Sequence, residues 1–344
     1  MRSIIFIMFF CIFLFGENAF DRFNISVELS KQRNDTNSTP NYNYLTGGMS
    51  IDKSISMGEY GKANISWYAK SSENTDGNNS VNLIFKEAYV DFNIQDIQVI
   101  LGRAIIDLST SKMYSINTFL SPITFLLDIS DKSLRSYGLD GVSVQGQTNF
   151  LDTEWLFYLY KNHYNDSLTS LIHIKNTNRL VSSNLYVGID RTQDFFISSG
   201  FSFTLNESSN LYLETKYKKE KITYVAGFDY EMQNGISMAI ERLSKDLENT
   251  TPPKNPANML SYLRDDDYVG GYLRIPYNEA SVSSFFGFYN MSDKSRVIVF
   301  QNEYTVRDFK VFFDFINNMG SNKNSEFESK VSNIVKLHFS LNIG

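Results

Sequence analysis

The chain has 344 residues and a formal net charge of −6, with 20% charged and 15% aromatic residues. The charges are spread along the chain without a basic patch, which predicts that nucleic acid is not a partner. The single cysteine, Cys11, lies close to the N-terminus, so the rest of the chain has neither a disulfide framework nor a thiolate zinc site.

Residues 1–19 have the pattern of a secretory signal peptide. Met-Arg-Ser is followed by the apolar run IIFIMFFCIFLF and then by the small residue Ala19. A basic start, a short apolar stretch and a small residue before the cleavage point are typical of export signals. The alternative is a retained membrane anchor, which needs an apolar span of roughly 20 residues. We therefore expect export and cleavage near Ala19.

From residue 20 onward the dominant pattern is the alternation of apolar and polar residues, which predicts β-strands with one apolar face. Phe23, Ile25 and Val27, for example, alternate with Asn24 and Ser26. The segments that show the pattern are 21–32, 43–53, 60–71, 81–94, 97–105, 136–148, 152–163, 167–175, 181–191, 195–206, 209–219, 221–231, 235–244, 267–277, 280–290, 293–305, 307–318 and 329–343. Segment 167–175 shows it least clearly, so about 16 strands is the alternative to about 18.

The connections between these segments alternate in length. Breaks after even-numbered segments are tight, such as Gln95-Asp96, and the long ones (31–43, 71–80, 105–135, 245–266 and 318–328) all follow odd-numbered segments. Short turns at one end and long loops at the other are typical of outer-membrane barrels. A soluble β-sandwich also alternates, but it seldom needs so many amphipathic strands. We predict an all-β fold: one transmembrane antiparallel β-barrel over residues 20–344.

The connection over residues 105–135 is the longest break, and it is partly apolar. An apolar stretch at the long-loop level has no membrane-spanning role. We therefore expect it to fold into the barrel and form a constriction loop.

No catalytic or cofactor motif occurs in the chain. The three histidines, His163, His173 and His338, are far apart in sequence, and no HExxH, GxSxG or phosphate-binding glycine loop is present. We expect no enzyme activity, no cofactor and no metal site.

The polar rows and the long connection supply charged and polar residues of both signs as candidates for lining a pore. The candidates are Glu87, Tyr89, Asp91, Arg103, Asp107, Lys112, Asp128, Asp131, Lys132, Arg135, Glu214, Lys216, Asp229, Glu231, Glu241, Arg274, Glu303, Lys310, Asp314 and Lys336. The mixture of signs does not indicate a strongly ion-selective pore.

One stretch of about forty residues resembles a segment of the large Gram-negative outer-membrane porins, which have 16–18 strands. The run FKEAYVDFNIQDIQVILGRAI and the later SINTFLSP carry the resemblance. The matching positions are Glu87, Ala88, Tyr89, Asp91, Gly102, Arg103, Asn117 and Pro122. The resemblance implies a loop after this hairpin that narrows the barrel.

The expected function is passive diffusion of small hydrophilic solutes through a water-filled barrel in the outer membrane. The expected partners are outer-membrane lipid, small hydrophilic solutes or ions, and the barrel-assembly machinery, with the chain as a monomer or a trimer. The alternative is a non-conducting surface barrel that acts through its long outer loops as an adhesin, a structural protein or a receptor.

Overall fold

The computed structural model describes residues 22–34, 42–58, 61–74, 79–105, 138–148, 153–161, 168–178, 180–189, 194–245, 267–319 and 331–343, together with Thr110, Met113 and Ile116. The expected signal peptide at residues 1–19 lies outside this part of the chain. No helix among the described residues is long and apolar enough to cross a membrane.

All the regular structure described is β-strand. The strands are β1 (Arg22–Asn34), β2 (Tyr42–Ser56), β3 (Gly61–Asn74), β4 (Asn79–Ile94), β5 (Ile97–Ala104), β6 (Leu139–Thr148), β7 (Thr153–Lys161), β8 (Leu168–Thr177), β9 (Val181–Ile189), β10 (Phe195–Asn206), β11 (Ser209–Lys218), β12 (Lys221–Glu231), β13 (Ser237–Lys245), β14 (Asp267–Asn278), β15 (Ser281–Asn290), β16 (Arg296–Val306), β17 (Phe309–Met319) and β18 (Val331–Ile343). The least clear predicted segment, 167–175, is strand β8. The predicted count of 18 strands is therefore confirmed, and the alternative count of 16 is wrong.

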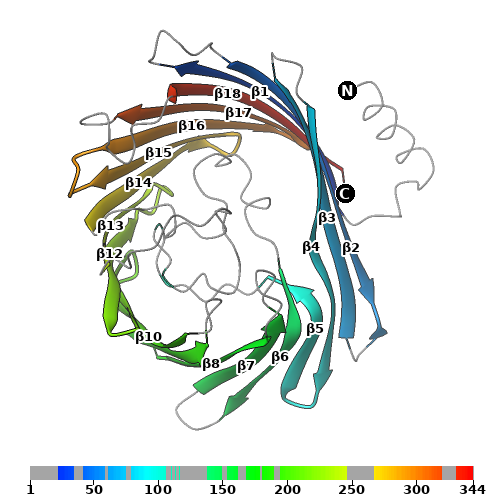
Figure 1. Ribbon diagram of the computed structural model, residues 1–344, viewed down its shortest axis with the longest axis vertical. Coiled ribbons are helices and arrows are strands. Elements are labelled where there is room, and N and C mark those ends of the chain that lie inside the picture. The colour runs from blue at the N-terminus through cyan, green and yellow to red at the C-terminus, as the bar shows by residue number, and fades with distance from the viewer. Residues whose placement is uncertain are drawn as a thin grey trace.

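The strands form one closed antiparallel barrel. Each strand pairs with its neighbours in the chain, and β1 also pairs with β18, from Phe23 opposite Ile343 to Asn34 opposite Val331. Figure 1 shows the strands arranged as a ring around the lumen, with β1 beside β18. The predicted barrel is confirmed.

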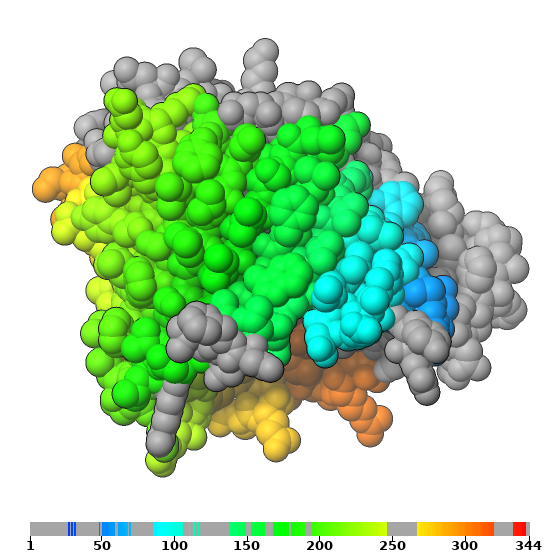
Figure 2. Space-filling model, turned by 90° about the horizontal axis from the view of Figure 1, so that it is seen from below, coloured from blue at the N-terminus to red at the C-terminus, as the bar shows by residue number. Residues whose placement is uncertain are grey.

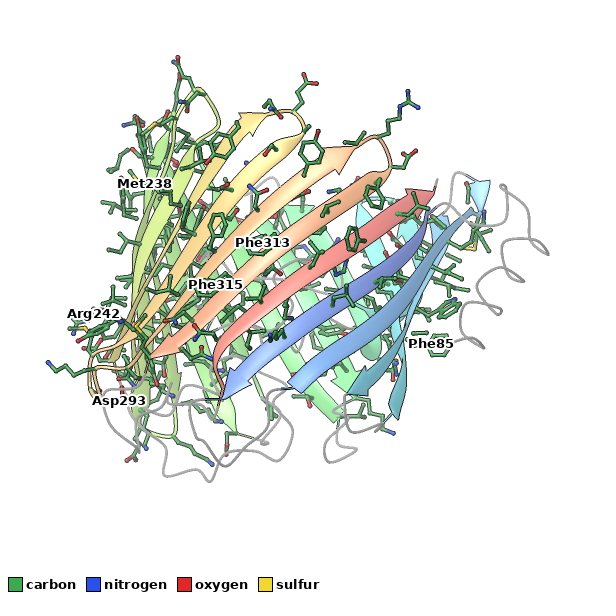
Figure 3. All side chains as sticks on the ribbon, turned by 90° about the horizontal axis from the view of Figure 1, so that it is seen from above. Phe85, Met238, Arg242, Asp293, Phe313 and Phe315 are labelled. Atoms are coloured by element: carbon green, nitrogen blue, oxygen red, sulfur yellow. The ribbon has the colours of Figure 1, made fainter. Side chains whose placement is uncertain are left out.

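The outer surface is apolar because the apolar members of each alternating pair point outward. On β11 the side chain of Leu213 is 41% exposed, whereas that of the next residue, Glu214, is 0% exposed. Phe313 and Phe315 project from the outer face of β17 in the same way (Figure 3). In Figure 2 the strands coloured from cyan to green form one continuous outer face. An apolar exterior of this kind suits contact with lipid chains.

The two ends of the barrel differ in their connections. The short-turn end has two-residue turns. Examples are Gln95-Asp96 between β4 and β5, and residues 207–208 between β10 and β11. The long-connection end has the two longest breaks, residues 105–138 and 246–266. In Figure 3, Arg242 and Asp293 lie near the long-connection end and Met238 lies near the other. One connection at the long-connection end is also tight: Lys219-Glu220, where both residues have positive φ, as in hairpin turns.

The hairpin that carries the porin resemblance contains one irregularity. The register between β3 and β4 shifts so that Ser66 pairs with Glu87 and Trp67 with Phe85, which leaves Lys86 as the extra residue of a bulge. Phe85 and Glu87 share sequence parity, yet the bulge turns Phe85 to the outer surface and Glu87 to the lumen. A bulge that re-aims one side chain is a common device at barrel walls.

Candidate functional site in the barrel lumen

The connection after β5 enters the lumen. Its described residues contact the barrel wall both at β4, next to β5, and at β13, on a distant part of the ring. We call Ile105, Thr110, Met113 and Ile116 the inward segment. The backbone N–H of Ile105 donates to Glu87 Oε1 on β4 at 3.2 Å. The backbone N–H of Met113 donates to Glu241 Oε1 on β13 at 2.9 Å. The segment therefore reaches from β4 to strands far round the barrel.

Two carboxylates hold the inward segment. Glu214 Oε1 accepts hydrogen bonds from the backbone N–H of Thr110 and, at 2.5 Å, from its hydroxyl. Glu241 Oε1 accepts the Met113 N–H and, at 2.6 Å, the hydroxyl of Tyr212. The side chains of Glu214 and Glu241 are 0% and 1% exposed, and a buried carboxylate is tolerated only with such donors. These glutamates therefore fix the position of the segment.

Glycine at position 200 makes room for this contact. A Cβ there would lie 3.3 Å from the Thr110 hydroxyl oxygen, closer than most side chains approach. Gly200 lies opposite Glu214 on the neighbouring strand, so Thr110 sits between the two positions.

Beyond these hydrogen bonds, the segment packs into an apolar cluster on the inner surface of β12–β18. Met113 and Ile116 are buried there, at 6% and 2% exposure. The wall residues of the cluster are Val225, Leu243, Tyr268, Phe288, Val297, Val299, Ile316 and Ile334. All of them lie toward the long-connection ends of their strands. We call this group the lumen cluster.

A second apolar cluster lies toward the same end on the inner surface of β6–β10. Its members are Leu139, Tyr158, Tyr160, Leu171, Tyr186 and Phe196. The hydroxyl of Tyr158 donates to the carbonyl of Leu139 at 2.9 Å. The half of the lumen nearest the long connections, which we call the apolar half, therefore has apolar groups on two sides.

Toward the short-turn end the lumen is polar and contains a chamber of about 920 Å³. Its lining includes Gln98, Gln145, His173 and Asn184 on the wall, and Thr110 of the inward segment. A second cavity of about 580 Å³, at β2–β5, shares Asn93 and Gln98 with the first. The two volumes together form a polar space that reaches the turn residues Gln95 and Asp96.

Most of the predicted pore-lining residues that are described share the inward-facing rows. These are Glu87, Tyr89, Asp91, Glu214, Lys216, Asp229, Glu231, Glu241, Arg274, Glu303, Lys310, Asp314 and Lys336. Several are engaged in the wall itself: Lys310 Nζ lies 2.8 Å from Glu303 Oε1, and Gln301 donates to Asp314 at 2.9 Å. Asp107, Lys112, Asp128, Asp131, Lys132 and Arg135 lie outside the described residues.

Arg103 is a correction to this set. It lies on the row of Leu101, which is 41% exposed on the outer surface, and its guanidinium forms two 2.8 Å hydrogen bonds with Asp140 of β6. The Gly-Arg pair places the glycine inward: Gly102 has φ +119°, and a Cβ there would lie 2.3 Å from the carbonyl oxygen of Ala88. Arg103 therefore points away from the lumen.

Sequence reasoning missed the neutral members of the site. Gln98, Gln145 and Asn184 line the chamber, and none is among the predicted pore-lining residues, because charge does not single out a neutral amide. The signal was present in the sequence, since each of the three alternates with apolar neighbours such as Val99, Val144 and Leu185. Among the described residues, no group of three or more His, Cys, Asp or Glu is placed to hold a metal ion.

A closed ring of antiparallel strands with an apolar exterior and a polar chamber in its lumen is typical of the class of outer-membrane β-barrels. The predicted location in the outer membrane agrees with this class, and the fold implied by the porin resemblance is confirmed.

Solved structures of several outer-membrane proteins share the fold. OccAB4 of Acinetobacter baumannii is similar with a TM-score of 0.63 and 8% identity, covering 93% of this chain and 97% of that one. OprD, an outer-membrane protein of Pseudomonas aeruginosa, has a TM-score of 0.57 and 8% identity over 93% and 92% of the two chains. Wzi of Escherichia coli, an outer-membrane protein involved in group 1 capsule assembly and described as a carbohydrate-binding β-barrel, has a TM-score of 0.61 and 11% identity over 98% and 87%.

At these identities the likeness concerns the fold. No family model matches the sequence, and no curated protein matches it.

Proposed function

We propose that this protein is an outer-membrane porin through which small hydrophilic solutes diffuse passively. The observation that carries the proposal is the polar chamber of about 920 Å³ inside a closed barrel with an apolar exterior. A space of that size is within the ~300–1,000 Å³ of sites that hold small organic molecules. Solutes would cross the polar half through this chamber.

The inward segment supports a constriction in the lumen. Its contacts with Glu87, Glu214 and Glu241 hold it across the interior, and the lumen cluster fixes its apolar side chains against one wall. The part of the lumen that stays open beside the segment would then lie on the side of the barrel opposite β12–β18. In this proposal the short-turn end faces the periplasm and the long connections face outward, as in other barrels of this class.

The test is electrical recording from the purified full-length protein in planar lipid bilayers. We expect discrete conductance steps, because one closed barrel contributes one water-filled path. The matched variant is Glu214→Ala with Glu241→Ala, which removes both carboxylate anchors and should give larger or noisier steps. A protein that inserts as a folded barrel and passes no current at any voltage would contradict the proposal.

The second candidate is a non-conducting surface barrel that binds a partner. The burial of Met113 and Ile116 in the lumen cluster favours it, because apolar packing in the lumen reduces the space for water. The description of Wzi as a carbohydrate-binding barrel gives one example of a binding role for the fold. Saturable binding to polysaccharide by a protein that shows no conductance would select this candidate.

A further inference from the structure

A continuous set of polar side chains runs along the chamber wall from β4 to β6. Gln98 Nε2 on β5 donates to Asp91 Oδ1 on β4 at 2.7 Å. The side-chain amide of Gln145 on β6 donates in turn to Gln98 Oε1. Each hydrogen bond joins neighbouring strands, so the amides are held in place rather than free to rotate.

The wall continues over β7–β9 with two more cross-strand contacts. Lys175 Nζ on β8 lies 3.1 Å from Glu154 Oε2 on β7. A ring nitrogen of His173 lies 3.0 Å from Asn184 Oδ1 on β9, and the His173 ring stacks on Tyr186 with centroids 4.6 Å apart. We call these side chains on β4–β9 the polar belt.

Charge in the described lining of the two cavities is almost balanced. The lining has two lysines, Lys62 and Lys175, and three carboxylates, Asp91, Asp96 and Glu154. Two carboxylates are matched by lysines: Glu154 by Lys175, and Asp91 by Lys62 at 3.8 Å. Pores that select ions by charge have rings of one sign, and the described belt has no such ring.

Amides are the most frequent polar side chains in the rest of the lining. Six line the larger chamber: Asn93, Gln95, Gln98, Gln145, Gln147 and Asn184. An amide side chain both donates and accepts hydrogen bonds, as a hydroxyl group does. An uncharged solute rich in hydroxyls can therefore replace its hydrogen bonds to water with bonds to the belt. An ion that enters meets a described lining whose net charge is only −1, from three carboxylates and two lysines, and this offsets little of its lost hydration.

We propose that the chamber selects uncharged polyhydroxylated solutes, of the chemical class of sugars, over ions of similar size. The selection rests on the proposed porin function and deepens it, with the polar belt as the specificity-determining surface. Gln98 and Gln145 provide the fixed hydrogen-bonding groups, and the Glu154–Lys175 pair keeps the wall near neutrality.

The experiment compares three solutes of similar size in liposomes that contain the full-length protein: glucose, glucosamine and gluconate. Swelling rates report permeation. We expect glucose to enter severalfold faster than either charged solute, and the reversal potential in a KCl gradient to lie near zero. Faster entry of gluconate or glucosamine, or a strong reversal potential of either sign, would overturn the inference and leave the porin function standing. No permeation of any solute would overturn both.

Two variants test the belt itself. Gln98→Glu with Gln145→Glu keeps side-chain size and adds negative charge, so the reversal potential should shift toward cation preference and glucose entry should fall. Gln145→Leu removes one hydrogen-bonding group and should lower glucose entry about fivefold. The control is Gln233→Glu, an exposed residue of the turn between β12 and β13 at the same end of the barrel, which should change neither quantity.

A variant that fails to fold is recognised by loss of the heat-dependent gel mobility of intact barrels. If a glutamine variant fails to fold, the double variant Glu154→Gln with Lys175→Gln is used instead. The double change preserves the net charge of the belt. We expect the double variant to keep glucose preference and zero reversal potential, and Lys175→Gln alone to acquire cation preference. Equal behaviour of the single and double variants would contradict the role of charge balance.

Discussion

The two halves of the lumen use inward-facing rows of very different chemistry. In the apolar half, Leu243, Val299 and Tyr268 point inward and are each 0% exposed. In the polar half, Gln98, Gln145 and Asn184 occupy the corresponding inward rows and line open space. The difference shows that an inward-facing row of a barrel can be apolar where other groups in the lumen cover it and polar where it lines open space. Where the inward segment covers the wall, the row is a core like that of a soluble protein.

The two buried glutamates lie between these halves, near the middle of their strands. Each accepts hydrogen bonds from the inward segment at a position where the wall changes from apolar to polar. Hydrogen bonds to a charged group contribute about 1.5–3 kcal/mol each. The glutamates are thus polar like the residues of the polar half, and they hold the inward segment in place as the apolar half does.

The largest effect on conductance is expected when the inward segment, which covers the wall of the apolar half, is removed. Replacing residues 106–135 by a short Gly-Ser linker should raise single-channel conductance severalfold, because the inward segment no longer occupies the lumen. Planar-bilayer recording measures it. Shortening the connection at 246–266 is the control and should leave conductance unchanged; an unchanged conductance in the first variant would indicate that the segment does not narrow the path.

The next effect concerns the anchors between the halves. Glu241→Ala leaves the Met113 N–H and the Tyr212 hydroxyl without their shared acceptor, so the inward segment should detach for part of the time. We expect more current fluctuations and faster proteolysis within residues 106–135 of the reconstituted protein. Glu303→Ala is the matched control, because Glu303 pairs with Lys310 and has no described contact with the segment. Equal fluctuations in both variants would refute a specific role for Glu241.

A substitution within the apolar half should lower the free energy of unfolding. Leu243→Ala removes a fully buried side chain of the lumen cluster, and such changes cost about 2–5 kcal/mol. Urea titration of the barrel in lipid vesicles measures this cost. A loss below that of an exposed substitution such as Met232→Ala would show that the cluster is not packed as a core.

The smallest effect should come from the polar half. Gln145→Ala loses one hydrogen bond to Gln98, and lumen water can replace the amide, so the free energy of unfolding should fall by about 1 kcal/mol or less. The same urea titration gives the comparison with Leu243→Ala. Equal losses for the two variants would remove the distinction between the halves.

The barrel itself could be predicted closely from the sequence because strand alternation is a local signal. The hairpin predicted at 81–94 and 97–105 is observed as Asn79–Ile94 and Ile97–Ala104. The bulge at Lys86 could not be predicted in this way, because a single extra residue reverses the inward parity and leaves the alternation of the flanking runs intact.

The roles of the lumen residues could be predicted only in part. Glu214 and Glu241 were expected to line the pore, and they face the lumen, but their partners Thr110 and Met113 lie 104 and 128 residues away in the sequence. No periodic pattern reports a contact over that distance. Residues 117–135 of this connection lie outside the described residues, and Met113 and Ile116 supply the apolar packing that is described.

The pairing of β1 with β18 has a consequence for how the chain must be assembled. Residues from opposite ends of the polypeptide occupy one seam, so the ring cannot close until the last strand has been made and brought to the first. Contacts of such high sequence separation form slowly. Until the seam closes, two strand edges carry unpaired N–H and C=O groups that invite pairing with other chains. Because the chain is made from β1 to β18, the sheet stays open until β18 pairs with β1. During that time, folding without aggregation requires that the open edges are kept from pairing with other copies of this chain.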